Sequence, residues 1–198
     1  PQMSNKGNYI VSLSRVATWL GEQAEEAGVE IYPGFAGAQI VWDEDANGNK
    51  RGIRGIVTND IGLNKEGQPK DNYEPGMEFR APITLFAEGA HGSLSLKIMK
   101  ELKLREEVGA DPQTYGIGIK EVWRVKPENH EAGLVAHTMG HPLSTDTYGG
   151  SFMYHMDDNM VSLGLVVGLD YSNPYLSPYQ EFQRMKHHPF FAKVLEGG

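Results

Sequence analysis

Apolar residues recur every three or four positions near the start of the chain, and this spacing predicts an amphipathic helix. The positions are Leu13, Val16, Ala17, Leu20, Ala24 and Ala27. Ser12 is suited to cap the beginning of this helix and Gly28 to end it. The residues on either side of the helix have the composition of β-strands. We therefore expect residues 9–32 to form a strand, a helix and a strand that belong to a parallel sheet.

The next hundred residues mix short β-rich segments with polar turns. Residues 38–43 and 53–58 are β-rich and flank the turn at residues 45–48, which predicts a hairpin. Residues 59–76 are polar and carry Gly and Pro, so we expect an excursion there. A strand around residues 77–86 and a helix around residues 93–102 follow.

From residue 113 the predicted strands are longer and are joined by short turns, which is typical of an antiparallel sheet. They cover residues 115–125, 134–139, 151–156 and 161–169. A final helix is predicted at residues 177–187, ending near Pro189. The fold class is therefore α+β: an α/β piece with a parallel sheet in residues 1–108, then a mostly antiparallel sheet with a helix in residues 109–198.

Composition narrows the classes of function. The chain has 18 Lys and Arg against 26 Asp and Glu, a net charge of −8, and its isoelectric point is near 5.4. This excess of acid argues against nucleic-acid binding and against attraction to anionic lipid. Cys is absent, so this chain contains no disulfide and no Cys-ligated cluster. No apolar run approaches the roughly 18 residues that span a bilayer.

Two segments have the spacing of metal sites without the accompanying ligands. Residues 43–48 match the opening of a calcium loop, but Arg54 stands where a bidentate Glu belongs, and a hairpin is favoured. His137 and His141 have the spacing of a helical zinc pair, yet Gly140 and Pro142 oppose a helix. We therefore assign no metal site.

Two glycine-containing segments are better candidates for ligand binding. Residues 83–93 form an apolar run that breaks into small residues before a helix, a geometry that lets a dinucleotide approach backbone amides. Residues 147–155 place Gly149 and Gly150 at the mouth of an aromatic strand, where a flat ligand could meet the backbone. A tight turn explains the first segment equally well, and a bulge or turn explains the second.

Taken together, these segments resemble the electron transfer flavoprotein-ubiquinone oxidoreductase family. The resemblance covers nearly the whole chain, and its segments are residues 7–11, 21–25, 85–89, 113–118, 147–152, 163–171, 173–178 and 181–189. The most specific part is Asn173-Pro174-Tyr175-Leu176-Ser177-Pro178 with Lys186-His187-His188-Pro189.

The resemblance implies a place for each part of the chain within a flavoenzyme. Residues 1–108 would be the middle of its FAD domain, and residues 109–198 much of its ubiquinone-binding domain. The flavin-facing turn would comprise Ala87, Glu88, Gly89 and Gly92. The quinone headgroup would meet the backbone of Gly149 and Gly150, with Tyr148 and Phe152 shaping the pocket.

The same resemblance implies partners that lie outside this chain. Electrons would come from electron transfer flavoprotein and leave to ubiquinone, and the parent enzyme would be associated with a bacterial or mitochondrial inner membrane. The family's iron-sulfur cluster would belong to the parent alone, because this chain has no Cys. No G-x-G-x-x-G finger is present either. We therefore expect an internal fragment that is not catalytically competent alone.

Two alternative functions remain open from the sequence. Flavoproteins of the geranylgeranyl reductase or monooxygenase type share the strand-to-helix flavin turn, although residues 173–189 favour the quinone reductase. A non-catalytic ligand-binding module, in which the glycines shape a pocket, is the interpretation from a different class.

Overall fold

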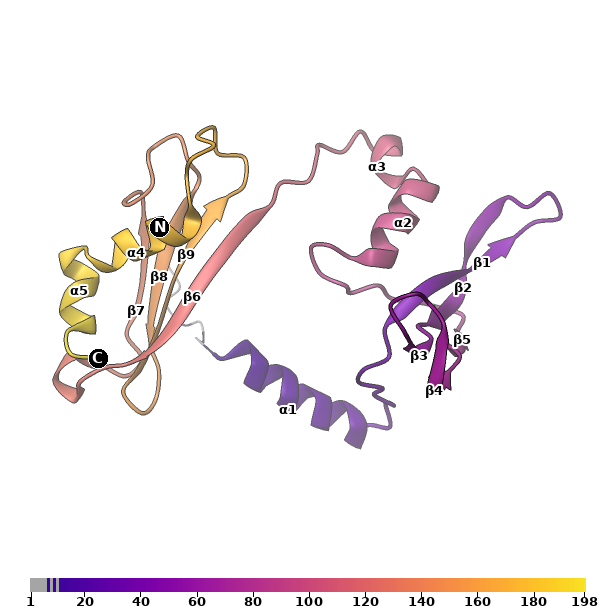
Figure 1. Cartoon of the computed structure of the whole chain (residues 1–198), viewed down its shortest axis with the longest axis horizontal. Helices are drawn as coiled ribbons and strands as arrows, with labels where there is room; N and C mark the ends of the chain where they lie inside the picture. The colour runs from indigo at the N-terminus through magenta and orange to yellow at the C-terminus, as the bar shows by residue number, and fades with distance from the viewer. Residues whose placement is uncertain (1–6, 8, 10) are drawn as a thin grey trace. The chain divides into compact units, whose positions relative to one another are not determined.

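The computed structural model describes residues 7, 9 and 11–198 of the chain (Figure 1). It divides after Asp111 into two compact units, close to the boundary expected after residue 108. Helices and sheets occur together, so the predicted α+β class is confirmed. All strand pairs within the described residues are antiparallel.

The first unit contains two small sheets and three helices. Its elements are α1 (Leu13–Glu26), β1 (Gly37–Glu44), β2 (Lys50–Thr58), β3 (Ile61–Leu63), β4 (Pro69–Glu74), β5 (Glu78–Arg80), α2 (Ser93–Glu101) and α3 (Leu104–Glu107). Strands β1, β2 and β5 form one sheet, and β3 pairs with β4. Helix α2 packs on β1 through Leu94, which is 3% exposed.

The predicted hairpin at residues 38–58 is confirmed as β1 and β2. Its turn is organised by Asp45, whose carboxylate accepts the backbone N–H of Asn47 and of Asn49, both at 2.9 Å. A carboxylate committed to its own turn is a structural device, in agreement with the hairpin interpretation. The excursion at residues 59–76 forms the β3–β4 hairpin, which the sequence does not predict.

The prediction of a parallel sheet in the first unit is wrong for the residues that the structure describes. Residues 29–32 form no strand, and of the strand predicted at residues 77–86 only β5 forms. Ile83 and Leu85 are 77% and 89% exposed. A β-strand needs a neighbour for its backbone groups, and no described segment of this chain supplies one here. The strand expected before α1 lies partly outside the described residues.

The second unit is a four-stranded antiparallel sheet with helices. It contains β6 (Gly116–Arg124), a 3-10 turn (Pro127–Asn129), β7 (Val135–Met139), β8 (Gly149–His155), β9 (Met160–Gly168), α4 (Pro178–Lys186) and α5 (Pro189–Leu195). The strand order is β6-β9-β8-β7. All four strands and α4 agree with the sequence prediction to within two residues, whereas α5 is not predicted.

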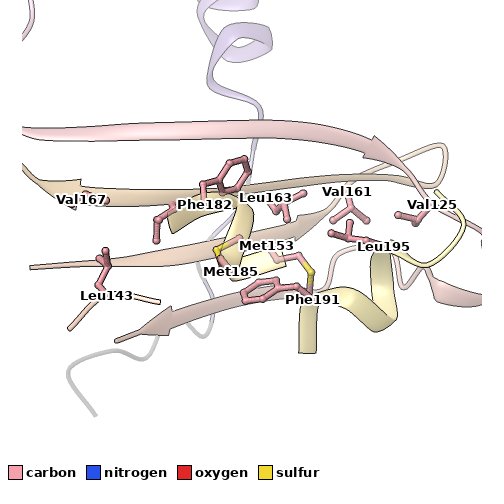
Figure 2. Packing of buried hydrophobic residues seen from close by; sticks show 11 residues of the cluster. Val125, Leu143, Met153, Val161, Leu163, Val167, Phe182, Met185, Phe191 and Leu195 are labelled. Atoms are coloured by element: carbon pink, nitrogen blue, oxygen red, sulfur yellow. The ribbon is translucent and has the colours of Figure 1, made fainter. Parts of the chain in front are cut away.

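One face of this sheet carries the core of the unit. Alternate residues of β8 and β9 meet side chains from α4 and α5, as Figure 2 shows. The fully or almost fully buried members are Met153, Val161, Leu163, Leu165, Val167, Phe182, Met185 and Phe191. Because strand side chains alternate between faces, this burial fixes which residues face the helices and which face away.

A polar contact reinforces this packing at its edge. Lys186 of α4 forms an ion pair with Glu121 of β6 at 2.7 Å, and the indole N–H of Trp123 donates to the same carboxylate at 2.8 Å. The ammonium also lies over the Trp123 ring, 5.3 Å from its centre. Helix α4 is thereby held across the sheet from β9 to β6.

Replacing Phe182 by Ala tests this one-sided core. Phe182 has 0% exposure, so we expect the free energy of unfolding to fall by about 3–5 kcal/mol. The matched control is Phe190→Ala, at a ring that is 46% exposed, for which we expect a change below about 1 kcal/mol. Urea denaturation of the full chain measures both values, and equal losses would contradict this assignment of the core.

Candidate functional site

The sheet face that points away from α4 and α5 is built from three cross-strand rows. The registers align Gly118, Val166, Gly150 and Met139 in one row, Lys120, Gly164, Phe152 and His137 in the next, and Val122, Ser162, Tyr154 and Val135 in the third. We call this surface the open face. Its apolar members remain accessible, with Met139 at 77% and Val122 at 50% exposure.

An aromatic platform occupies the middle of the open face. The Phe152 ring lies on Gly164 of the neighbouring strand, where a Cβ on the glycine would come within 2.5 Å of the ring. Phe152 also stacks on Tyr154, with ring centres 5.0 Å apart and planes at 20°. Gly164 therefore leaves room for the phenyl ring over β9, and the two stacked rings form an apolar pair on the open face, which is the aromatic platform.

The predicted glycines Gly149 and Gly150 lie at the beginning of β8, where the neighbouring strand ends. Pairing between β7 and β8 ends at Met139–Gly150, so Gly149 lies one residue past that ladder. Side-chain alternation places Gly150 on the open face and Gly149 on the helix face. Beyond the end of this ladder the chain forms the loop that leads into β8, and Cδ1 of Leu143 in that loop lies 2.5 Å from a Cβ built on Gly149.

Both glycines also have a structural reason to be glycine. A Cβ at Gly149 would lie 2.3 Å from the Val166 carbonyl oxygen, and one at Gly150 would lie 2.3 Å from that of Thr138. Either substitution would push neighbouring strands apart. A side chain at Gly150 consequently damages the sheet as well as any pocket, so these two positions cannot report on ligand binding by themselves.

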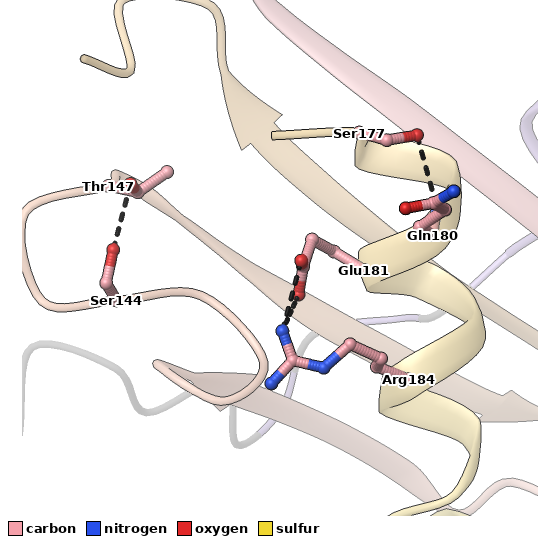
Figure 3. Close-up of polar contacts among 6 residues, drawn as sticks. All are labelled: Ser144, Thr147, Ser177, Gln180, Glu181 and Arg184. Atoms are coloured by element: carbon pink, nitrogen blue, oxygen red, sulfur yellow. Dashed lines mark hydrogen bonds and ion pairs between the residues drawn. The ribbon is translucent and has the colours of Figure 1, made fainter. Parts of the chain in front are cut away.

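Tyr148 precedes these glycines and projects into solvent, with 81% exposure. Its carbonyl accepts the backbone N–H of Gly168 at 2.8 Å, which extends the contact with β9. The loop leading into it is held by short-range bonds, including Ser144 with Thr147 at 3.3 Å (Figure 3). Figure 3 also shows α4, where the Ser177 hydroxyl caps the Gln180 N–H at 3.4 Å.

The turn predicted to face a flavin has a different organisation from the one expected. Glu88 folds its carboxylate onto the beginning of α2, where it accepts the N–H of Leu94 at 3.1 Å and both the N–H and the hydroxyl of Ser95 at 2.6 Å. These hydrogen bonds, foremost that of the Ser95 hydroxyl, lower the pKa of Glu88. A negative charge is favourable at this positive end of the helix.

This arrangement fits one part of a flavin nucleotide and not another. Gly89 has a φ of +75°, and no atom lies within 4 Å of a Cβ built there, so a ligand can reach its backbone. At Gly92 a Cβ would meet the Ser95 side chain at 2.9 Å, which shows that Gly92 serves internal packing. Because Glu88 already occupies the amides of Leu94 and Ser95 at the beginning of α2, a pyrophosphate would have to displace this carboxylate to bind them. Ala87 lies outside regular structure.

Neither of the metal-like segments assembles a centre. His137 contacts Tyr154, with its Nε2 atom 2.9 Å from the hydroxyl, while His141 lies against His188 with ring centres 5.3 Å apart. Among the residues that the structure describes, no group of three His, Cys, Asp or Glu side chains is placed to hold an ion.

A separate cleft of about 500 Å³ lies on the helix side of the sheet. Its lining includes Trp123, Lys186 and Lys193, and the Lys186 charge is paired with Glu121. None of the residues predicted to bind quinone or flavin lines this cleft.

Sequence reasoning misses two residues of the open face. The sequence presents His137 only as a metal candidate and assigns Tyr154 no role. The alternation of Gly150, Phe152 and Tyr154 along β8 is the signal that could group them on one face. The pairing of His137 opposite Phe152 depends on the β7–β8 register, which the sequence does not specify.

Comparison with known proteins defines the class. Residues 115–198 match the family model described as ETF-QO, ubiquinone-binding. These residues are therefore similar to the ubiquinone-binding region that this family model describes.

The individual relatives agree with this match, and their similarity to the chain covers its whole length. The chain is 58% identical over 198 residues to a probable electron transfer flavoprotein-ubiquinone oxidoreductase, mitochondrial, of Schizosaccharomyces pombe. It is 57% identical to the corresponding protein of Saccharomyces cerevisiae and 52% identical to that of Homo sapiens. All of this chain, or 99% in the human case, is covered. The predicted resemblance to electron transfer flavoprotein-ubiquinone oxidoreductase is confirmed.

The chain spans about 30% of the length of the curated relatives it matches. It is thus a homologue of one region of these enzymes, and that region includes the ubiquinone-binding domain. In the described part of the chain, no helix has the length and apolar character needed to cross a membrane.

The Glu88 cap predicts a pH-dependent local stability. Because the pKa of Glu88 is lower in the folded chain than its ordinary value of 4.5, its contribution is present above about pH 4.5 and is lost as the pH falls through the folded pKa. At neutral pH, Glu88→Ala should destabilise the start of α2 by about 1 kcal/mol, comparable to loss of an N-cap.

Hydrogen exchange at the Leu94 and Ser95 amides measures this effect. We expect exchange to become roughly fivefold faster at pH 7 in Glu88→Ala, and the difference between variant and original chain to shrink as the pH falls through the lowered pKa of Glu88. The control, Glu107→Ala in α3, should leave these amides unchanged. Identical protection in the original chain and Glu88→Ala at pH 7 would contradict the cap.

Proposed function

We propose that this chain is part of an oxidoreductase that passes electrons from electron transfer flavoprotein to ubiquinone. The match of residues 115–198 to the ubiquinone-binding family carries the proposal, and the identities of 52–58% over the whole chain support it. In this proposal residues 112–198 bind the quinone, and residues 1–111 belong to a flavin domain. The chain alone lacks the remaining redox centres and is not competent for turnover.

The open face is the proposed location of the quinone headgroup. It offers the stacked rings of Phe152 and Tyr154, near the point where the pairing between β7 and β8 ends at Gly150. A quinone ring needs an apolar surface for its faces and hydrogen bonds for its two carbonyl oxygens. The backbone at Gly149 and Gly150 would bind one oxygen, with Tyr148 and Phe152 shaping the pocket.

The first unit has the surface expected of a domain completed by other segments. No residue of α1 is buried, and Leu85 is 89% exposed, so apolar positions of this unit have no cover within the described chain. FAD would supply the redox chemistry of the parent, with the Ala87–Gly89 backbone approaching it. Gly92 and Glu88 would hold the turn, and the pyrophosphate would bind elsewhere than at α2.

The remaining parts of the proposal concern the parent enzyme. An iron-sulfur cluster would have its ligands outside this chain, which has no Cys. The relatives of Schizosaccharomyces pombe and Homo sapiens are named as mitochondrial proteins, which favours association of the parent with the mitochondrial inner membrane over a bacterial one. Reduced electron transfer flavoprotein would be the electron donor.

Phe152→Ala in the full-length oxidoreductase tests the proposed quinone site. Removal of the platform should raise the KM for a soluble ubiquinone analogue about tenfold, the loss of one aromatic contact of roughly 1.4 kcal/mol. The reduction of the enzyme by electron transfer flavoprotein should be unchanged.

The matched control is Phe190→Ala, which removes a ring from α5 on the other side of the sheet. It should leave the KM for quinone unaltered. A Phe152→Ala enzyme with the original KM would refute the location on the open face, and an original enzyme without quinone reductase activity would refute the function itself.

A further inference from the structure

A hydrogen-bonded His–Tyr pair stands beside the aromatic platform on the open face. The Nε2 atom of His137 lies 2.9 Å from the hydroxyl oxygen of Tyr154, and the two rings meet edge to face with centres 5.5 Å apart. His137 is also the direct cross-strand partner of Phe152. The Phe152 ring, the Tyr154 phenol and the His137 imidazole are therefore contiguous on the open face.

The pair links a partly buried group to solvent. Tyr154 is half-buried under its stack with Phe152, whereas His137 is exposed at the edge strand β7. When a phenol has donated its proton, an imidazole bonded to it can return a proton to the phenolate and take another one from water. Nothing in the packing of the sheet requires this pair to be polar, because the core lies on the other face.

We propose that Tyr154 is the proton donor to one oxygen of the bound quinone and that His137 restores its proton. This inference rests on the proposed function, because it concerns the same site. Reduction of a quinone to a quinol requires two electrons and two protons, and each carbonyl oxygen gains one O–H bond. The electrons are those that the reduced flavoprotein donor supplies in the proposed reaction.

The proton transfer balances within the pair. The Tyr154 O–H bond breaks as the O–H bond of the quinol forms, and the phenolate that remains takes the Nε2 proton of a cationic His137. His137 then recovers a proton from water. The second oxygen of the quinone receives its proton from solvent at the Gly149 end of the site, where β7 has ended.

The spacing along β8 suits this arrangement. Gly150 and Phe152 lie two residues apart, about 7 Å along the strand, and the Tyr154–His137 bond returns to the row of Phe152 because His137 is the partner of that residue. In this arrangement one oxygen of the quinone accepts a hydrogen bond at the Gly149–Gly150 end, and the ring lies beside Phe152 with its other oxygen toward the Tyr154 hydroxyl.

Few other ionisable groups face this pair. Only β8 is paired with β7, and on β8 the other titratable side chain within the described strand is His155, which is buried on the helix face at 4% exposure. In the same row as His137, Lys120 of β6 is separated from it by Gly164 and Phe152.

The test uses Tyr154→Phe and His137→Gln in the full-length oxidoreductase, assayed with reduced electron transfer flavoprotein and a soluble ubiquinone analogue. Tyr154→Phe keeps the aromatic stack and removes the donor, so kcat should fall about 100-fold while KM changes less than about threefold. His137→Gln should lower kcat about tenfold, because the Tyr154 phenolate then regains its proton more slowly.

Matched controls are Tyr179→Phe on α4 and His187→Gln directly after it, at the other side of the sheet; both should retain the original kcat. Added imidazole should restore part of the activity of His137→Gly and none of that of Tyr154→Phe. An unchanged kcat in Tyr154→Phe or in His137→Gln, or a His137→Gly enzyme that imidazole does not restore, would overturn the proton relay. If the original enzyme does not reduce quinone, the proposed function fails instead.

Discussion

The burial of α4 and α5 against one face of a four-stranded sheet determines the organisation of the second unit. Phe182 and Met185 are completely buried against Leu163 and its neighbours, and the alternation of strand side chains then assigns every residue of β8 to one face or the other. Gly150, Phe152 and Tyr154 face away from the helices for this reason. A functional surface is thus produced by packing on the opposite side.

Close approach of backbones shapes that surface further. Gly164 leaves room for Phe152 over β9, and the strands at Gly149 and Gly150 are too close for any side chain. The first unit shows a related arrangement at α2, where the carboxylate of Glu88 takes the place that an external anion would occupy at a helix N-terminus. Both glycine-containing segments therefore have internal structural duties in addition to the binding proposed for them.

Local patterns in the sequence predict most individual elements. Helix α1 follows from the spacing of Leu13, Val16 and Leu20, and the strands of the second unit follow from their β-rich runs between turns. The apolar patterns of residues 29–32 and 83–86 predict strands of a parallel sheet that do not form. A strand needs a neighbouring strand to pair with, and the spacing of apolar residues does not reveal whether one is present. The His137–Tyr154 contact depends on strand register and is likewise beyond the sequence. Gly149 and Gly150 are candidates from the sequence pattern, while their role toward a quinone comes from the family resemblance.

Binding of the quinone headgroup on the open face at β8 is the central claim. Photolabelling of the full-length oxidoreductase with a ubiquinone analogue that carries an azido group on its ring, followed by peptide mapping, tests it most directly. We expect label within residues 148–154, suppressed by excess ubiquinone. Label confined to the cleft between α4, α5 and β6, with residues 148–154 unmodified, would contradict it.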